Sequence, residues 1–309
     1  MAHGHHEQGQ GHEHGQGHGH GHGHGHQHGS KDLDWATMIP HLEHGAAVYE
    51  PLYTEALTWL RGTRPDGTGL IVDAGAGPGA VSLHLAAAFP EARIIAADPE
   101  EALLARATER FAAAGLTDRT DTLRVELPDD IGELPHADLI WAARSLHHVG
   151  DQRAAIAALA GRLAPGGTLA LVEGGLPTRC LPRDFGLGKP GLQSRAEAIE
   201  EEWFDEMRRS LPGAKQDTED WAALLTDAGL TAARSRTFLL DLPAPLSDEA
   251  RGVLVDLWQR RRDAYADVVP AEDLDVIGRL VDPDDPQSLQ NRKDVFLLTA
   301  NTVHIAVKA

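Results

Sequence analysis

The chain has 309 residues, of which 42% are hydrophobic, and its formal net charge at pH 7 is −19. This length fits one large domain or a domain with a cap. An acidic protein is a poor partner for nucleic acid or an anionic membrane, because both contacts depend on cationic side chains. There is no apolar run near the roughly 20 residues that span a bilayer and no secretory signal, and the single cysteine, Cys180, cannot pair within the chain. We therefore expect a cytoplasmic protein that binds neither nucleic acid nor membrane.

Residues 1–30 are rich in His, Gly, Gln and Glu, and they are expected to be disordered because they cannot bury a core. This tail holds eleven histidines, and five of them alternate with glycine: His18, His20, His22, His24 and His26. Imidazoles on a flexible chain bind Ni²⁺, Zn²⁺ or Cu²⁺, so adventitious metal is expected here. The irregular Gln and Glu insertions favour a genomic origin over a purification tag. Nothing in the remaining sequence indicates a metal in the core.

Residues 31–66 carry apolar side chains at helical spacing and are expected to form a helical cap. Strands and helices alternate from residue 67 to residue 309. This alternation predicts an α/β domain: a Rossmann-like, doubly wound sheet, mostly parallel with an antiparallel last strand. Helical insertions are expected near 176–215 and 246–293.

Composition and turn residues predict each element of this domain in chain order. The expected strands are residues 70–73, 93–97, 123–125, 138–142 and 168–172, a sixth after Leu230, and a last at 295–307. The expected helices are residues 80–89, one with Pro99 in its first turn and a stop at Gly115, 152–163, 194–210 and the segment 220–230.

The first strand ends in Asp73 and runs into Gly75, Gly77 and Gly79, which a helix former follows at once. Strand, tight turn and helix open a nucleotide-binding unit, in which the first amide N–H groups of the helix point at the ligand. The looser dinucleotide pattern G-x-G-x-x-G/A is also satisfied. A carboxylate at the position of Asp73, however, suits a ligand with a positive ammonium group and would repel a pyrophosphate.

The run from Asp73 to Gly79 resembles the first motif of class I S-adenosylmethionine (SAM)-dependent methyltransferases. Residues 138–151, which pass through Leu-His-His to an acid, resemble the fourth-strand segment of small-molecule members. Residues 165–173 and 220–230 resemble the turn into strand five and the helix before strand six. The resemblance covers roughly residues 45–240. It implies SAM as the cofactor and methyl transfer to a small-molecule acceptor.

Acidic residues at strand ends are the next candidate ligand-binding groups. Asp98 closes the second strand beside the glycine turn, where it can accept hydrogen bonds from both ribose hydroxyls; a helix N-cap before Pro99 is the alternative. Asp130, followed by Ile131, is the best match to the family's acid on the adenine amino group, with Asp129 close behind. A solvated acidic loop is the alternative for this pair.

The resemblance implies a set of cofactor-binding residues from the glycine turn, the strand ends and one cap tyrosine. They are Asp73, Ala74, Gly75, Gly77, Gly79, Asp98, Pro99, Asp130, Ile131, Ala143, Arg144 and Tyr53. His147 and His148 are candidate catalytic bases, which the reaction needs only if the acceptor holds its proton. One should point toward the cleft and the other toward the sheet; alternatively, both brace a loop.

Two other functions stay open. An NAD(P)-dependent oxidoreductase would share the glycine turn, although no Tyr-x-x-x-Lys or comparable proton donor is visible. A metal-handling protein would use the tail and keep an inactive methyltransferase-like core. The sequence indicates neither the acceptor atom nor the oligomeric state.

Overall fold

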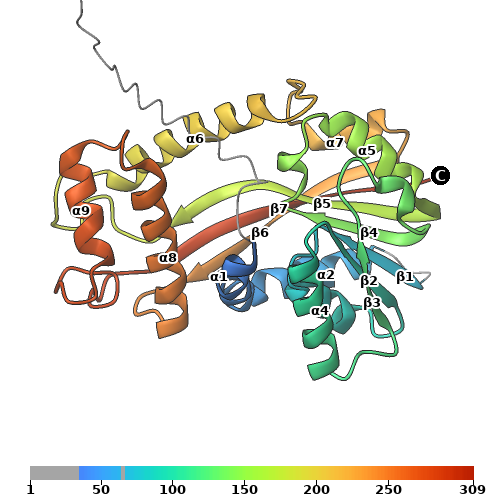
Figure 1. Ribbon diagram of the computed structural model, residues 1–309, viewed down its shortest axis with the longest axis horizontal. Helices are drawn as coiled ribbons and strands as arrows, with labels where there is room; N and C mark the ends of the chain where they lie inside the picture. The colour runs from blue at the N-terminus through green and yellow to red at the C-terminus, as the bar shows by residue number, and fades with distance from the viewer. Residues whose placement is uncertain (1–34, 64–66) are drawn as a thin grey trace, which may run out of the picture.

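The computed structural model describes residues 35–63 and 67–309. The predicted tail, with its candidate metal ligands, lies outside these residues. The described part contains strands β1 (Leu70–Ala74), β2 (Arg93–Asp98), β3 (Thr120–Arg124), β4 (Ala137–Ala143), β5 (Leu163–Arg179), β6 (Thr231–Leu242) and β7 (Leu297–Val307). They form a seven-stranded sheet with the order β3-β2-β1-β4-β5-β7-β6 (Figure 1).

Every neighbouring pair of strands is parallel except the two that β7 makes with β5 and β6. The predicted fold class is thereby confirmed, including the antiparallel last strand. The parallel strands end at one edge of the sheet, and in open α/β sheets ligands bind in the crevice outside that edge.

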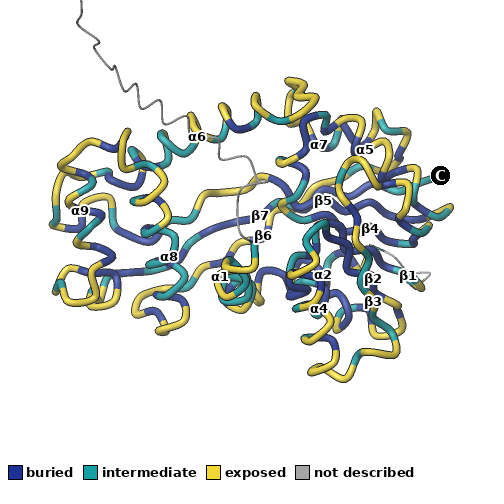
Figure 2. The backbone as a smooth tube through the Cα atoms, in the orientation of Figure 1, coloured by how far each residue is buried: buried dark blue, intermediate teal, exposed yellow. Residues whose placement is uncertain are grey.

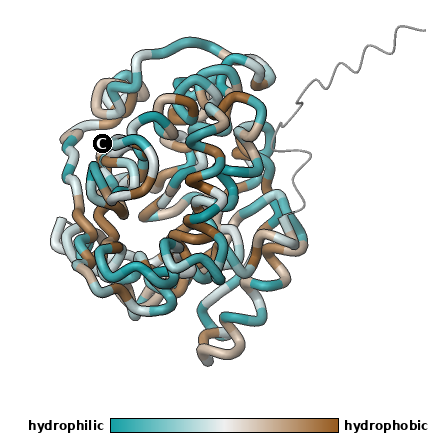
Figure 3. Tube along the Cα trace, turned by 90° about the vertical axis from the view of Figure 1, so that its left-hand side faces the viewer, coloured by the Kyte–Doolittle hydropathy of each residue, from teal (hydrophilic) through white to brown (hydrophobic). Residues whose placement is uncertain are grey.

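Helices cover both faces of the sheet. They are α1 (Trp35–Val48), α2 (Glu50–Gly62), α3 (Ala80–Ala88), α4 (Glu101–Ala113), α5 (Gln152–Gly161), α6 (Leu192–Ser210), α7 (Trp221–Asp227), α8 (Asp248–Tyr265) and α9 (Ala271–Val281), with short 3₁₀ turns η2 (Ile131–Glu133) and η3 (Leu146–His148). Helices α2, α3 and α4 pack on one face and α5 and α7 on the other. Most helices alternate between hydrophilic and hydrophobic segments, as amphipathic helices do (Figure 3).

The core strands are the most deeply buried part of the molecule (Figure 2). β4 has the apolar run Leu139, Ile140, Trp141 and Ala142, each fully buried. A strand with both faces covered by helices needs such a continuous apolar run, so this segment was well suited to prediction.

Most elements differ from their predicted bounds by a residue or two, and three of the differences bear on the fold. β5 was expected at 168–172 but runs from Leu163 to Arg179, because β7 continues to pair with it as far as Arg179↔Leu298. β3 starts earlier than expected, since its pairing with β2 begins at Ile94↔Thr120. Pro99 lies before α4, which begins at Glu101, so it is outside the first helical turn.

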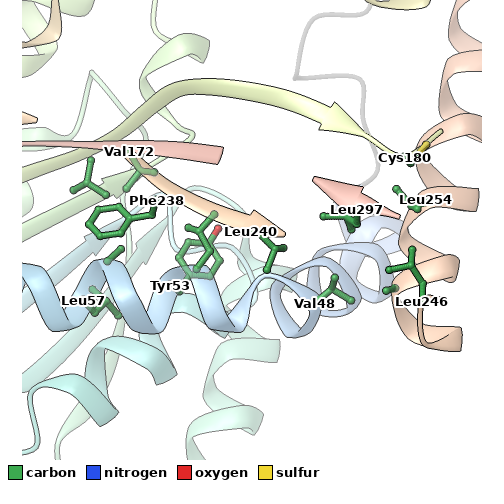
Figure 4. Packing of buried hydrophobic residues seen from close by; sticks show 14 of the residues in the cluster. Val48, Tyr53, Leu57, Val172, Cys180, Phe238, Leu240, Leu246, Leu254 and Leu297 are labelled. Carbon is green, nitrogen blue, oxygen red and sulfur yellow. The ribbon is translucent and has the colours of Figure 1, made fainter. Parts of the chain in front are cut away.

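The long strands β5, β6 and β7 extend past the core toward α8 and α9, and α6 runs back along one side (Figure 1). α1 and α2 fall within the predicted helical cap, and α6, α8 and α9 within the predicted insertions. Side chains from α1 and α2 pack against β6 and β7 and, farther out, α8 (Figure 4). Val48, Tyr53, Phe238 and Leu254 are four of the buried members of this cluster.

Buried ion pairs fasten these outer helices to one another. Arg261 on α8 makes two hydrogen bonds of 2.8 Å with Glu200 on α6. Arg195 on α6 pairs in the same forked way with Asp273 on α9. A forked guanidinium–carboxylate pair fixes orientation as well as distance, so α6, α8 and α9 are held in one arrangement relative to one another.

Candidate active site

A cavity of about 1380 Å³ lies against the carboxyl ends of β1, β2 and β4. The glycine turn and the end of β2 form one side of it. Helices α1, α2 and α8 border the other side, through residues such as Tyr49, Tyr53 and Arg260. The cavity is larger than the 300–1,000 Å³ typical of a site for one drug-sized ligand. It therefore has room for two reactants side by side.

The three glycines of the turn have left-handed backbones, but they differ in what surrounds them. A Cβ on Gly75 would lie 2.8 Å from Cβ of Ser145, and one on Gly79 would lie 2.8 Å from Cβ of Ala107 on α4. A Cβ on Gly77 would meet no protein atom within 4 Å, and this residue borders the cavity. Gly75 and Gly79 thus allow close packing of the protein, whereas Gly77 leaves space that a ligand can use.

Asp98 lies at the end of β2 with only 6% of its surface exposed, and it borders the cavity. Its Oδ2 accepts a hydrogen bond of 2.8 Å from the Gly77 N–H, and its Oδ1 accepts one of 3.0 Å from the Glu100 N–H. Burial raises the pKa of this carboxyl group. Glu100, and not Asp98, is the N-cap of α4, so the capping alternative does not describe Asp98. Each carboxylate oxygen keeps a lone pair with which to accept a ligand hydroxyl.

Asp73 is 2% exposed and lies behind the wall of the cavity with Ala74 and Gly79. The Ser82 hydroxyl donates a hydrogen bond of 2.6 Å to its Oδ2. Burial is the main cause that raises the pKa of Asp73 to about 7, and the negative charge of Asp98 adds to it. A carboxyl group in this place can influence a ligand through its charge, but it does not border the cavity directly.

Asp130 and Ile131 do not lie where the resemblance suggested. Asp130 turns back and accepts a hydrogen bond from the Glu126 N–H, and Ile131 is buried in the apolar cluster below β4. Asp129 borders the cavity instead, from the same loop. The reason is that the 3₁₀ turn η2 starts at Ile131 and directs this side chain into the core. Pro99 borders the cavity.

The end of β4 brings Ala143, Arg144 and Ser145 to the cavity. Arg144 has a backbone φ of 53°, a left-handed conformation that side chains other than glycine rarely adopt. Its N–H donates a hydrogen bond of 3.0 Å to the Val172 carbonyl, which holds it there. Such strain, of order 1–3 kcal/mol, persists where the surroundings enforce it and is concentrated at functional sites.

His147 forms a dyad with Glu173, a buried residue of β5. The Nδ1 atom of His147 lies 3.0 Å from Oε2 of Glu173, while Oε1 accepts a hydrogen bond from the Leu146 N–H. With an ionised Glu173, Nδ1 carries the proton and Nε2 is left as an acceptor, which is the arrangement of a general base. The ring of Phe204 on α6 packs on His147 at 5.8 Å.

His148 lies next to this dyad, with 4.2 Å between the two imidazole centroids. Desolvation is the main cause that lowers the pKa of His148, and the neighbouring His147 adds to it. Both rings border the cavity; His147 is the one directed to the sheet, through Glu173. Arg208 on α6 donates hydrogen bonds to the carbonyls of His147 and Val149, so α6 supports this loop.

Two tyrosines of the cap complete the wall. Tyr53, a predicted cofactor contact, is buried and stacks on His84 with 6.0 Å between ring centroids. Burial raises the pKa of its phenol. The hydroxyl groups of Tyr49 and Thr178 lie 3.2 Å apart, and both residues border the cavity.

Sequence reasoning did not assign a role to Glu173, Thr178, Asp256 or Arg260. Glu173 did have a usable signal, because it follows a buried apolar strand as Asp73 and Asp98 do. The other three lie on the long strand β5 and on α8, and their position at the cavity depends on the tertiary arrangement alone.

Within residues 35–63 and 67–309, no group of three or more His, Cys, Asp or Glu side chains could hold a metal ion. In the same ranges, no helix is both long and apolar enough to cross a membrane. Cys180 is buried, and Trp258 Nε1–H donates to its sulfur at 3.2 Å.

Comparison with known proteins shows which family this chain resembles. A family model described as a methyltransferase domain matches residues 72–169, which include the glycine turn, Asp98 and the His147–His148 loop. This segment of the chain is thus similar to methyltransferase domains. The structural features around this domain, including the β7 pairing and the cap helices, lie largely outside the matched segment.

Curated relatives of the methyltransferase domain are similar over about a third of the chain. An uncharacterized methyltransferase of Mycobacterium bovis is 36% identical over 109 residues, which cover 35% of this chain and 52% of the relative. Trans-aconitate 2-methyltransferase of Variovorax paradoxus is 39% identical over 104 residues, which cover 33% of this chain and 37% of the relative. The chain thus matches about half or less of the length of these relatives.

A solved structure of phosphoethanolamine N-methyltransferase 2 from Haemonchus contortus, bound to SAM, is 15% identical and has a TM-score of 0.46. The match covers 89% of this chain and 60% of that one. A likeness of this size carries no argument about substrate.

The surroundings of Gly77 and Gly79 predict different effects of an alanine substitution on stability and on ligand binding. Gly77→Ala should cost about 1–2 kcal/mol of stability for the left-handed backbone and should abolish ligand binding at the turn, because its methyl group enters the open space. Gly79→Ala should cost more stability, because its methyl group also overlaps the packed helix α4. Urea denaturation and calorimetric titration of SAM would check both. Equal losses of stability would contradict the assignment.

Asp73 predicts a pH-dependent stability difference. Its pKa of about 7 in the folded protein lies above the unfolded value of 3.8, so the folded state holds a proton that the unfolded state has lost. Wild-type protein should therefore lose up to a few kcal/mol relative to Asp73→Asn as the pH rises from about 4 to above 7. Denaturation at pH 5 and pH 8 would measure this difference. A difference that does not depend on pH would show that the carboxyl group is not titrating as expected.

Proposed function

We propose that the protein is a SAM-dependent methyltransferase that acts on a small-molecule acceptor. The observation that carries the proposal is the joint geometry of Gly77 and Asp98 on one side of the cavity and the His147–Glu173 dyad on the other. On this proposal, Asp98 would bind the nucleoside and His147 would accept a proton, and both border one volume that has room for two reactants.

The cofactor side fits SAM on three grounds. Gly77 leaves open space where a side chain would block a ligand. Asp98 keeps free lone pairs for the ribose hydroxyls on a buried, rigid carboxylate. Asp73 lies behind the turn as a buried carboxyl group, and a cationic ligand would favour its ionised form. Ala143, Arg144 and Tyr53 would border the methionine end, and Pro99 and Asp129 the adenosine end.

SAM supplies an activated methyl group, and the protein mainly positions the acceptor and excludes water. The cap helices α1, α2 and α8 border the acceptor side of the cavity, where they limit access of solvent. His147 is placed to accept a proton from an acceptor hydroxyl or amine at Nε2, while Glu173 fixes the tautomer through Nδ1. Glu173 acts as a positioning residue, since it reaches the acceptor only through His147.

A small acceptor is favoured over nucleic acid by the acidic net charge of the chain, and the cap helices that border the cavity favour an acceptor small enough to lie between them and the glycine turn. One relative is named for methylation of trans-aconitate, a small acid, which supports the same class of acceptor. The cytoplasmic location inferred from the lone Cys180, and the metal-binding role of the tail, stay predictions. The match to methyltransferases favours this proposal over the NAD(P) oxidoreductase and over an inactive core.

Calorimetry with the full chain tests the cofactor. SAM and S-adenosylhomocysteine should bind with micromolar affinity, and NADH should not. Asp98→Ala should weaken both adenosyl ligands by tenfold or more, because it removes a charged acceptor of ribose hydrogen bonds. Asp129→Asn serves as a comparison on the adenosine side, with a smaller expected loss. Binding of NADH alone would move the assignment to the oxidoreductase.

The dyad predicts a selective loss of turnover. With an acceptor that must lose a proton, His147→Ala should lower kcat by about 10²–10⁴ and leave the KM for SAM nearly unchanged. Glu173→Gln should lower kcat by a comparable factor, because its amide oxygen still accepts from the Leu146 N–H while its NH₂ group faces Nδ1 and moves the imidazole proton to Nε2. His148→Asn is the matched control. If that control lost as much kcat as His147→Ala, the base would be His148 or the pair acting together.

A further inference from the structure

Two arginines border the acceptor side of the cavity without a protein partner. Arg144 lies at the end of β4 and Arg260 on α8, and both side chains are exposed to the cavity. Within residues 35–63 and 67–309, neither guanidinium group makes a hydrogen bond or an ion pair. In a chain with 47 acidic and 28 basic side chains, two such cations at one cavity are unexpected without a ligand.

Four buried or half-buried arginines of α6, α8 and the segment after α9 show the contrast. Arg195, Arg251, Arg261 and Arg292 each donate to carboxylate or carbonyl oxygens. A guanidinium group with a purely structural role makes hydrogen bonds of this kind with protein oxygens. Arg144 and Arg260 are therefore available for a ligand.

The two unpaired groups influence each other across the cavity. Desolvation is the main cause that lowers the pKa of Arg260, and the positive charge of Arg144 lowers it further. The nearby Asp256 and Tyr49 oppose this effect. Two cations that repel each other raise the free energy of the empty site, and an anion between them removes that cost.

Acidic side chains on the cavity wall are segregated toward the adenosine end. They are Asp98, Glu100, Glu101, Glu126 and Asp129. Among the described residues of α1, α2, β5 and α8 that border the cavity, Asp256 is the one acid, and its Oδ2 already lies 2.7 Å from Nδ1 of His41. The acceptor side is thus cationic, because the two guanidinium groups of Arg144 and Arg260 border it and its one acid is already paired.

We propose that the acceptor carries an anionic group, a carboxylate or a phosphate, that lies between Arg144 and Arg260. Guanidinium groups bind both of these anions through paired N–H donors. The hydroxyl groups of Tyr49 and Thr178 border the same cavity and can donate to further oxygens of the acceptor. This inference rests on the proposed function and narrows its substrate class.

Arg144 also lies near the end of the cavity assigned to the methionine part of the cofactor, so its role must be separated from cofactor binding. The strained backbone of Arg144 offers a suitable variant. Because its φ is 53°, glycine takes this conformation without cost, and Arg144→Gly should fold as well as the wild type. Arg260→Gln removes the second charge from an exposed position of α8.

The test is calorimetry with the full chain saturated with S-adenosylhomocysteine. The probes are benzoate, succinate, trans-aconitate and phenyl phosphate, each beside its neutral methyl ester. At least one anion should bind tenfold or more tightly than its ester, and the acid that does so distinguishes carboxylate from phosphate. Arg260→Gln and Arg144→Gly should each weaken that anion by about tenfold to a hundredfold.

Arg262→Gln is the matched control, because Arg262 lies on the same helix, pairs with the adjacent Asp263 and does not border the cavity. It should leave anion binding unchanged. Esters that bind as well as their acids would overturn the inference, as would a loss in Arg262→Gln equal to that in Arg260→Gln. An Arg144→Gly variant that weakens only S-adenosylhomocysteine would also overturn it. Failure of S-adenosylhomocysteine to bind the wild type would instead contradict the proposed function.

Discussion

The backbone pairing of β7 between β5 and β6 is the constraint on which the acceptor side of the molecule depends. β7 pairs with β6 from Thr231↔Val307 to Leu242↔Leu297, and with β5 as far as Arg179↔Leu298. All three strands are thereby kept extended beyond the parallel core, and they connect to α6, α8 and α9. Without this pairing, α8 would have no fixed position opposite the glycine turn, and the cavity would lose the part of its wall that α8 forms.

Glu173 lies where the parallel core meets this extension. Its carboxylate holds the Leu146 N–H and the His147 ring, while its backbone carbonyl is 3.2 Å from Nε2 of His304 on β7. One buried residue therefore ties the loop after β4 to the antiparallel strand. The position of His147 is set by the same contacts that complete the sheet, which explains how a site on a loop can keep a defined geometry.

The sequence was most informative where a local rule determines the structure. The turn from Asp73 to Gly79 and the apolar run of β4 obey such rules, and both were predicted with the correct fold class. The length of β5 was missed, because it depends on pairing with a strand more than a hundred residues later. Asp130 was misplaced for a similar reason: residues 129 and 130 are equivalent in sequence, and the start of η2 decides which one borders the cavity.

Arg260 illustrates the same limit in the candidate site. Arg260 belongs to a run of three arginines, residues 260–262, which nothing in the sequence distinguishes from one another, and Arg261 is buried against Glu200. The helix α8 distributes the three side chains to different surroundings, and only the packing of α8 on the extended strands determines which one reaches the cavity. Charge patterns within a helix therefore carry little information on ligands until the helix has been placed.

The order of the strands also has a consequence for synthesis on the ribosome. β6 is made before β7, yet it joins the sheet only through β7, because the two pair side by side and β6 has no other strand neighbour. Until β7 emerges, β5 therefore presents an open edge and β6 remains a separate segment. The parallel half of the sheet can fold early in synthesis. The helices α6, α8 and α9 can pack on the extended strands only after residues 297–307 have been made. During that interval the open edge of β5 could pair with a strand of another chain, and in cells chaperones prevent such pairing.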